Sequence, residues 1–136
     1  MKYWLILLGV LGLSSCTRVH YGNFTDGPSH HFNAMAKDTV TQLVSIFPPA
    51  RTQFCFSQRV KDGYGIELIR LLRERGYGLI ESRCMGQGVR FAYVVDTSIK
   101  KAFYRVTVWV ESQSLSRVYS LNQSQLMPVS AWSYKE

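Results

Sequence analysis

Three cysteines, Cys16, Cys55 and Cys84, are the residues of this 136-residue chain whose type and position could do covalent chemistry. Cys16 follows an apolar segment after two serines, at a position where a thiol can accept a lipid group at a membrane. Cys55 and Cys84 lie in segments with strand patterns, and in an oxidising compartment they could form a disulfide. The alternative is two separate thiols, with Cys55 packed as a small apolar residue. The sequence has no CxxC redox motif and no zinc-ligand spacing.

The N-terminal segment has the features of an export signal. Met1-Lys2 gives a positive start, and the apolar run that follows would span about 16 Å as a helix, too short to cross a bilayer. The run ends in Leu13-Ser14-Ser15-Cys16, which resembles the bacterial lipobox. The resemblance implies a lipoprotein signal peptide over residues 1–15, cleavage before Cys16 and acylation of this residue. The alternatives are an ordinary secretory signal with an incidental cysteine and a buried N-terminal strand.

The residue after the lipobox cysteine bears on the choice of membrane. Thr17 stands where an aspartate commonly causes inner-membrane retention in lipoproteins of this kind, so we expect the outer membrane. A lipid-anchored domain there would face the periplasm, which is oxidising and where DNA is not the usual partner. The formal net charge of +7 therefore does not lead us to expect direct nucleic-acid binding.

The sequence contains no constellation typical of an enzyme. All three histidines, His20, His30 and His31, precede the expected folded domain, and we interpret them as solvated linker residues rather than metal ligands. Paired carboxylates and a complete Gly-rich phosphate loop are also missing from the sequence. We therefore expect no enzyme activity, no metal, no cofactor and no small-molecule substrate.

The remaining sequence predicts a single small α+β domain over residues 33–136, after a flexible lipidated tether over residues 16–32. Apolar residues spaced four, three and four apart predict a helix from Asn33 to Phe47, which Pro48-Pro49 ends. A second helix is predicted from Gly63 to Arg75. Alternating patterns predict strands over residues 51–57, 77–83, 89–96, 102–110 and 115–121. We expect the two helices to pack on one face of a mainly antiparallel sheet of about five strands.

Three arginines, Arg70, Arg73 and Arg75, gather in the last turns of the second predicted helix. They could bind an acidic partner or lipid headgroups. A favourable interaction with the helix dipole, together with solubility, explains them equally well.

The last long hairpin is the most informative about binding. If Ser112-Gln113 forms its turn, one face of the hairpin is apolar except for Arg117. The opposite face should be wet, yet it carries Arg105 and Trp109, a combination typical of docking sites. The alternative is a Trp109 covered by the tether or by the C-terminal tail. Trp132 lies near the chain end, where it either packs back on the domain or binds a partner.

Several blocks of the sequence resemble the TrbH family of conjugal-transfer lipoproteins. They are Cys16 with Tyr21-Gly22-Asn23-Phe24, the block from Gln42-Leu43 to Pro48-Pro49-Ala50 with Arg51-Thr52-Gln53-Phe54, the block from Gly65 through Leu71-Leu72-Arg73-Glu74-Arg75-Gly76-Tyr77, Tyr104-Arg105-Val106-Thr107, Gln113-Ser114-Leu115-Ser116-Arg117-Val118-Tyr119 and the end that contains Trp132. Together these blocks cover most of the mature chain in the order expected of the family.

The resemblance implies a structural component of a conjugative type IV secretion system, the mating-pair-formation apparatus that transfers plasmid DNA. In such machines a small outer-membrane lipoprotein joins the core complex, so the implied partners are other core-complex proteins. The family has no catalytic residues to carry over, and Arg105, Trp109 and Trp132 are our candidate partner contacts. The alternative function is a periplasmic binding or pilotin-like lipoprotein, which serves the cell wall or an outer-membrane protein and is unrelated to conjugation.

Overall fold

The computed structural model describes residues 19–98 and 100–136, and Cys16 lies outside these residues. The described chain contains the α-helices α1 (Ser29–Ile46) and α2 (Gly63–Glu74) and a short 3-10 helix, η1 (Pro49–Arg51). The strands are β1 (Gly22–Asn23), β2 (Gln53–Phe56), β3 (Gly78–Ile80), β4 (Val89–Thr97), β5 (Phe103–Val110), β6 (Gln113–Asn122), β7 (Gln125–Pro128) and β8 (Ser133–Lys135). Neither α-helix in this part of the chain combines the length and the apolar character needed to span a membrane.

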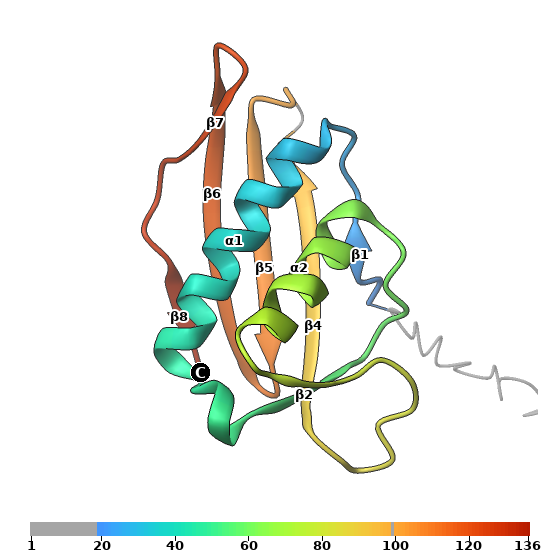
Figure 1. Ribbon diagram of the computed structural model, residues 1–136. Coiled ribbons are helices and arrows are strands. Elements are labelled where there is room, and N and C mark those ends of the chain that lie inside the picture. The colour runs from blue at the N-terminus through green and yellow to red at the C-terminus, as the bar shows by residue number, and fades with distance from the viewer. Residues whose placement is uncertain (1–18, 99) are drawn as a thin grey trace, which may run out of the picture.

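The domain has two layers, with both helices on the same face of the sheet (Figure 1). The strand order is β3-β2-β4-β5-β6-β7, while β1 also pairs with β4 and β8 with β6. The pairs β1–β4, β2–β3 and β2–β4 are parallel, and the pairs from β4 onward are antiparallel. The predicted α+β class with two helices is confirmed. The predicted mainly antiparallel sheet of about five strands is wrong, because the sheet is mixed and has eight strands.

Two physical features explain this difference in the sheet. A strand–helix–strand connection through α2 returns the chain in the same direction, so β2 and β3 run parallel. The strands β1 and β8 contain two and three residues, which is too short for an alternating pattern to reveal them.

Regular structure begins earlier in the chain than the sequence predicts. Residues 22–32, which we placed in the flexible tether, include β1 and the first turn of α1, which starts at Ser29 instead of Asn33. The two residues of β1 pair with Val94 and Val95 of β4. A pairing this short leaves no periodic signal in the sequence, so tertiary contacts alone define it.

Local signals set the bounds of α2. The Asp62 side chain caps its start by accepting a hydrogen bond from the Gly65 N–H (2.9 Å). Gly76 follows its end with a φ of 88°, a left-handed conformation that glycine adopts without strain. Gly65 also allows α2 to approach the sheet, because a Cβ there would overlap the hydroxyl of Tyr93. That hydroxyl donates a hydrogen bond to Asp62 Oδ2 (2.5 Å), which ties β4 to the start of α2.

The hydrophobic core lies between the helix layer and the sheet. Residues of both helices pack against alternate residues of the strands behind them. The core residues from the helices are Phe32, Met35, Ala36, Val40, Leu43, Tyr64, Leu68, Ile69 and Leu72, and those from the sheet and its connections are Phe54, Phe56, Tyr77, Phe91, Tyr93, Val95, Tyr104, Val106, Val108, Val110, Leu115 and Tyr119.

The β5–β6 hairpin turns at Glu111-Ser112 rather than at the predicted Ser112-Gln113. Val110 pairs with Gln113, so the register differs from the expected one by two residues. Because side chains alternate with a period of two, the predicted faces of the hairpin are kept. Glu111 has a φ of 55°, which suits the tight hairpin turn.

Candidate docking surfaces

The sheet face opposite α1 and α2, which we call the helix-free face, carries two of the three predicted contact residues. Tyr104, Val106 and Val108 of β5 belong to the core, so the residues that alternate with them point away from the helices. Arg105 and Trp109 therefore share the helix-free face.

Trp109 is half-buried because Tyr21 covers it. The two rings meet edge to face, with their centroids 5.6 Å apart. Tyr21 directly precedes β1, and just after β1 the Phe24 N–H donates a hydrogen bond to Val95 O (2.8 Å). Of the two covers considered from the sequence, the segment expected to form the tether is the one that contacts this tryptophan.

A hollow of about 130 Å³ lies beside this aromatic pair, lined in part by Arg90 and Glu111. Arg90 donates hydrogen bonds from its backbone N–H to Glu111 Oε1 (2.8 Å) and from Nε to Glu111 Oε2 (2.9 Å). These hydrogen bonds hold the pKa of Glu111 below its usual value. The two opposite charges largely cancel at this corner of the face.

Arg105 is also paired within the chain. Its Nη2 donates to Asp96 Oδ2 (2.5 Å) and its Nε donates to Asp96 Oδ1 (3.1 Å). These hydrogen bonds raise the pKa of Arg105. Both side chains are partly exposed, so solvent screening limits the contribution of the pair to stability to about 0–1 kcal/mol. The pair is thus accessible to a partner and contributes little to folding.

Trp132 lies on the other face of the sheet, between β7 and β8, where it packs against the edge of the core. The Arg117 guanidinium stands over its ring, 5.9 Å from the centroid. Arg117 also donates hydrogen bonds to Ser130 O (3.0 Å) and to both carboxylate oxygens of Asp38 in α1 (2.9 Å each). The C-terminal segment thus packs back on the domain, which is one of the two alternatives that the sequence left open.

Cys55 and Cys84 form a disulfide, with their Cα atoms 5.7 Å apart. Cys55 is fully buried, although it lies between the core residues Phe54 and Phe56 and so points to the helix-free face. The bond fixes the connection between β3 and β4 over this part of β2. On this face the disulfide-linked connection shields β2 from solvent, as the helices do on the other face.

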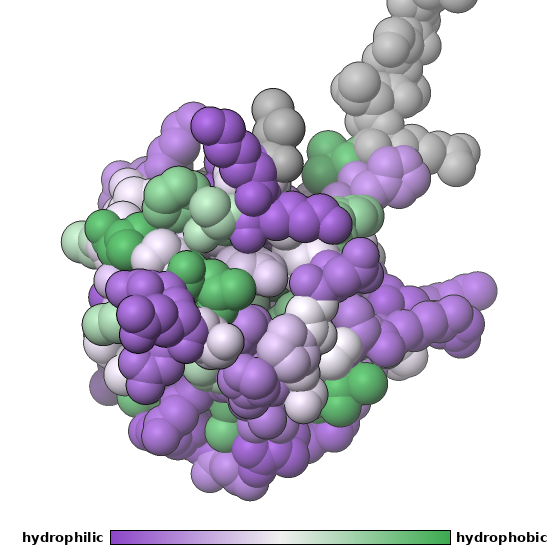
Figure 2. Space-filling view, turned by 90° about the horizontal axis from the view of Figure 1, so that it is seen from above, coloured by the Kyte–Doolittle hydropathy of each residue, from purple (hydrophilic) through white to green (hydrophobic). Residues whose placement is uncertain are grey.

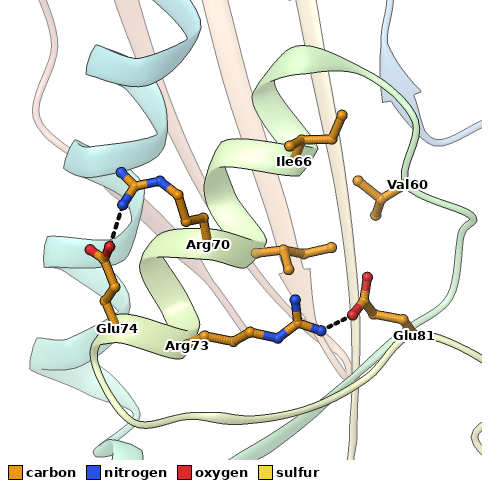
Figure 3. A pocket seen from close by; sticks show the side chains of 7 residues that line it. Val60, Ile66, Arg70, Arg73, Glu74 and Glu81 are labelled. Atoms are coloured by element: carbon orange, nitrogen blue, oxygen red, sulfur yellow. Dashed lines mark hydrogen bonds and ion pairs between the residues drawn. The ribbon is translucent and has the colours of Figure 1, made fainter.

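A groove of about 500 Å³ runs along the outer side of α2 and was not expected from the sequence. Figure 3 shows apolar Val60 and Ile66 at one end and the charged side chains at the other. The Ile66 side chain is 58% exposed and forms part of the apolar end of the groove.

The arginines of this groove are engaged with glutamates. Arg70 forms ion pairs with Glu67 and Glu74, and Arg73 pairs with Glu81. The hydrogen bond from Arg70 lowers the pKa of Glu67. These ion pairs leave less of the charge of Arg70 and Arg73 available to an acidic partner or to lipid headgroups, which favours the explanation by solubility at the helix end.

A second unexpected feature is a group of three exposed apolar residues, Phe103, Met127 and Val129, which we call the Phe103 patch. They are 47%, 51% and 53% exposed. Phe103 and Met127 both pair with Ser120, from opposite sides, so the side chains of Phe103, Ser120 and Met127 point to the helix-free face. The Val129 N–H donates a hydrogen bond to Val118 O (2.9 Å), which holds Val129 beside β6. Figure 2 views this end of the domain from above, and hydrophobic side chains gather on the β7 side. The patch depends on the register of three strands, which single-strand patterns do not give.

The histidines do not come together as a metal site in the described part of the chain. His31 is buried in the first turn of α1, with its ring 4.3 Å from that of His30 and its Nε2 3.4 Å from Ser124 O. Among residues 19–98 and 100–136, no group of three or more His, Cys, Asp or Glu side chains is close enough to hold a metal ion. The prediction that His31 is a solvated linker residue is wrong, because α1 starts before it.

Together, the fold and these surfaces define a small two-layer α+β domain whose accessible features are apolar patches and ion pairs. The family model described as "Conjugal transfer protein TrbH" matches residues 18–136, so the chain belongs to the TrbH family of conjugal transfer proteins. The resemblance inferred from the sequence blocks is thereby confirmed. The match spans all of the described structure. Comparison with curated proteins and with solved structures gave no match.

Proposed function

We propose that this chain is an outer-membrane lipoprotein with a scaffolding role in a conjugative type IV secretion apparatus. The family match over residues 18–136 carries the assignment to conjugal transfer. The Leu13-Ser14-Ser15-Cys16 motif supports a lipid anchor, and Thr17 supports the outer membrane. The disulfide between Cys55 and Cys84 fits an oxidising compartment such as the periplasm.

In this proposal the domain acts through its position and its surfaces. The acyl chains on Cys16 give stable attachment to the membrane, since two or more chains anchor where one does not. Other proteins of the transfer apparatus then bind its exposed surfaces. Of the contacts predicted from the sequence, Arg105 and Trp109 lie on the helix-free face, whereas Trp132 is packed against the edge of the core. No direct nucleic-acid contact and no small-molecule substrate is part of this function.

The most direct functional test is plasmid transfer from donor cells that carry Cys16→Ala in place of the wild-type gene. Loss of the anchor should abolish most transfer, while the matched lipobox variant Ser14→Ala, which keeps the thiol and a small side chain, should transfer normally. Immunoblots of both variants establish equal protein levels. Unimpaired transfer by Cys16→Ala would count decisively against an anchored role.

A co-purification experiment separates this function from the rival one. Detergent extracts of donor cells should yield the protein together with outer-membrane core proteins of the transfer apparatus. Capture of peptidoglycan, or of a single outer-membrane protein in cells without a conjugative plasmid, would favour the periplasmic binding or pilotin-like function.

A further inference from the structure

We infer that the helix-free face lies on the phospholipid leaflet. The lipid anchor holds this face at the Tyr21–Trp109 corner, and the Phe103 patch contacts headgroups at the far end. The helix layer then points away from the membrane and is the surface left for partner proteins, so Arg105 and Trp109 face the leaflet instead of a protein partner. The inference rests on the proposed acylation of Cys16 and adds to it an orientation.

The first support is the short length of chain between the anchor and the fold. Five residue steps separate Cys16 from Tyr21, so even a fully extended chain holds them at most about 17 Å apart. The sequence alone suggested a tether that continued to residue 32. Because Tyr21 already contacts Trp109, the corner of the sheet at β1 must stay close to the leaflet.

The second support is that this corner belongs to the sheet and cannot swing independently. β1 pairs with β4, and the Asn23 side chain accepts hydrogen bonds from the backbone N–H (2.9 Å) and the hydroxyl (2.6 Å) of Thr25. The chain enters the sheet on its helix-free side, where Tyr21 lies. An anchor attached here therefore draws this face, rather than the helix layer, towards the membrane.

The third support is the chemistry of the Phe103 patch. Six residues of β5 separate Phe103 from Trp109, which places the patch about 20 Å along the same face. Exposed Lys100 lines the same hollow as Phe103, and Lys101 beside it is also exposed. Apolar side chains flanked by lysines match the boundary between acyl chains and anionic headgroups.

The surface between the two ends permits close contact with a flat leaflet. Small polar residues lie there beside the Arg105–Asp96 pair and Val118, and the Ser116 hydroxyl donates to Thr107 Oγ1 (2.9 Å). Its two carboxylates, Asp96 and Glu111, are each paired with an arginine of the same face. Lys100 and Lys101 therefore leave this face with a positive balance, which suits an anionic surface.

Energy transfer from single tryptophans to dansyl-labelled headgroups tests this orientation in the acylated mature protein, reconstituted in phosphatidylethanolamine and phosphatidylglycerol vesicles. The mature chain has two tryptophans, Trp109 and Trp132. One variant keeps Trp109 and carries Trp132→Phe. Two others carry Trp109→Phe and Trp132→Phe with either Phe103→Trp, on the patch, or Ile66→Trp, on the exposed side of α2.

The efficiency of energy transfer to the labelled headgroups should be at least about twofold higher from a tryptophan at position 103 or 109 than from one at position 66, because a helix layer about 10 Å thick separates position 66 from the sheet. Both introduced tryptophans occupy exposed sites, so circular dichroism should show folded protein in each case. Equal or stronger transfer from position 66 overturns the orientation. So does a weak signal from position 103 alone, which indicates that another protein or solvent covers the patch.

A Gly-Ser segment of ten residues inserted after His20 provides the matched control. The longer link should remove most of the difference between positions 109 and 66, whereas the same segment added after Glu136 should leave it unchanged. An unchanged difference with the longer link contradicts the tether argument. If the orientation is wrong, plasmid transfer still depends on Cys16. If the proposed function is wrong, Cys16→Ala has no effect on plasmid transfer, so the two failures are distinguishable.

Discussion

Two arginine–aspartate pairs, one on each face of the sheet, have the same chemistry and different surroundings. Arg117 and Asp38 join β6 to α1 next to Trp132, and both side chains are largely buried. Arg105 of β5 and Asp96 of β4 are paired neighbours on the helix-free face, where more of each side chain is exposed to solvent. The first pair locks a helix and the C-terminal segment onto the sheet. The second leaves its face available for binding.

The same contrast holds for how each face is covered. The helix-covered face is closed by continuous packing, and tyrosine hydroxyls bond across it, as Tyr119 does to Asp38 Oδ2 (2.5 Å). The helix-free face is closed only locally, by Tyr21 over Trp109 and by the connection that the disulfide holds over Cys55. Folding stability should therefore depend on many contacts on the helix-covered face and on only a few on the helix-free face.

The largest expected effect comes from the covalent cover of the helix-free face. Replacing Cys55 and Cys84 together by alanine opens a loop whose ends are 29 residues apart, which should lower the free energy of unfolding by about 3–4 kcal/mol. Urea unfolding followed by circular dichroism measures the loss. Wild-type protein unfolded with a reducing agent should show a similar loss. A loss below about 1 kcal/mol would mean that this cover is not what stabilises the face.

A smaller effect separates the two ion pairs directly. Asp38→Asn leaves the largely buried Arg117 without its counter-ion and should cost about 1–3 kcal/mol in unfolding free energy. The matched variant Asp96→Asn, on the exposed pair, should cost at most about 1 kcal/mol. Equal losses in the two variants would remove the distinction between a structural and an accessible pair.

The smallest effect concerns alkaline pH. Burial raises the pKa of Tyr77, whose hydroxyl donates to Phe47 O (2.5 Å), from about 10 to about 12. The unfolded chain therefore releases this proton first, so the stability contribution is complete below pH 10 and declines as the pH rises towards 12. Tyr77→Phe should reduce the pH dependence of the unfolding free energy in this range by about 1 kcal/mol. An unchanged slope in urea titrations would contradict the assignment.

Much of the helix-covered side could be predicted from the sequence. The period of the apolar residues indicated both helices, and the alternation in β5 and β6 indicated the correct faces, although the turn lies one residue earlier than predicted and the register differs by two residues. Arg117 stood out as a charge on an apolar face, and Asp38 provides its partner. The parallel strands were not predicted. The sequence shows that a helix lies between β2 and β3, but it does not show which strands β2 pairs with.

Less of the helix-free face could be predicted. Arg105 and Trp109 were correctly placed together, but the cover by Tyr21 depends on β1, which is too short to leave a pattern. The Phe103 patch requires the register between β5, β6 and β7. The short length of chain between Cys16 and this face becomes evident only once β1 is known to start six residues after Cys16. Long-range pairing, rather than local propensity, defines what this face offers to a partner.

The central claim is that Cys16 carries a lipid anchor, and intact-mass spectrometry of the protein from native membranes tests it most directly. We predict a chain that begins at Cys16 and carries a diacylglycerol group on the sulfur and a fatty acid on the new amino group. An unmodified chain, or one that begins at another residue without acyl groups, would contradict the account.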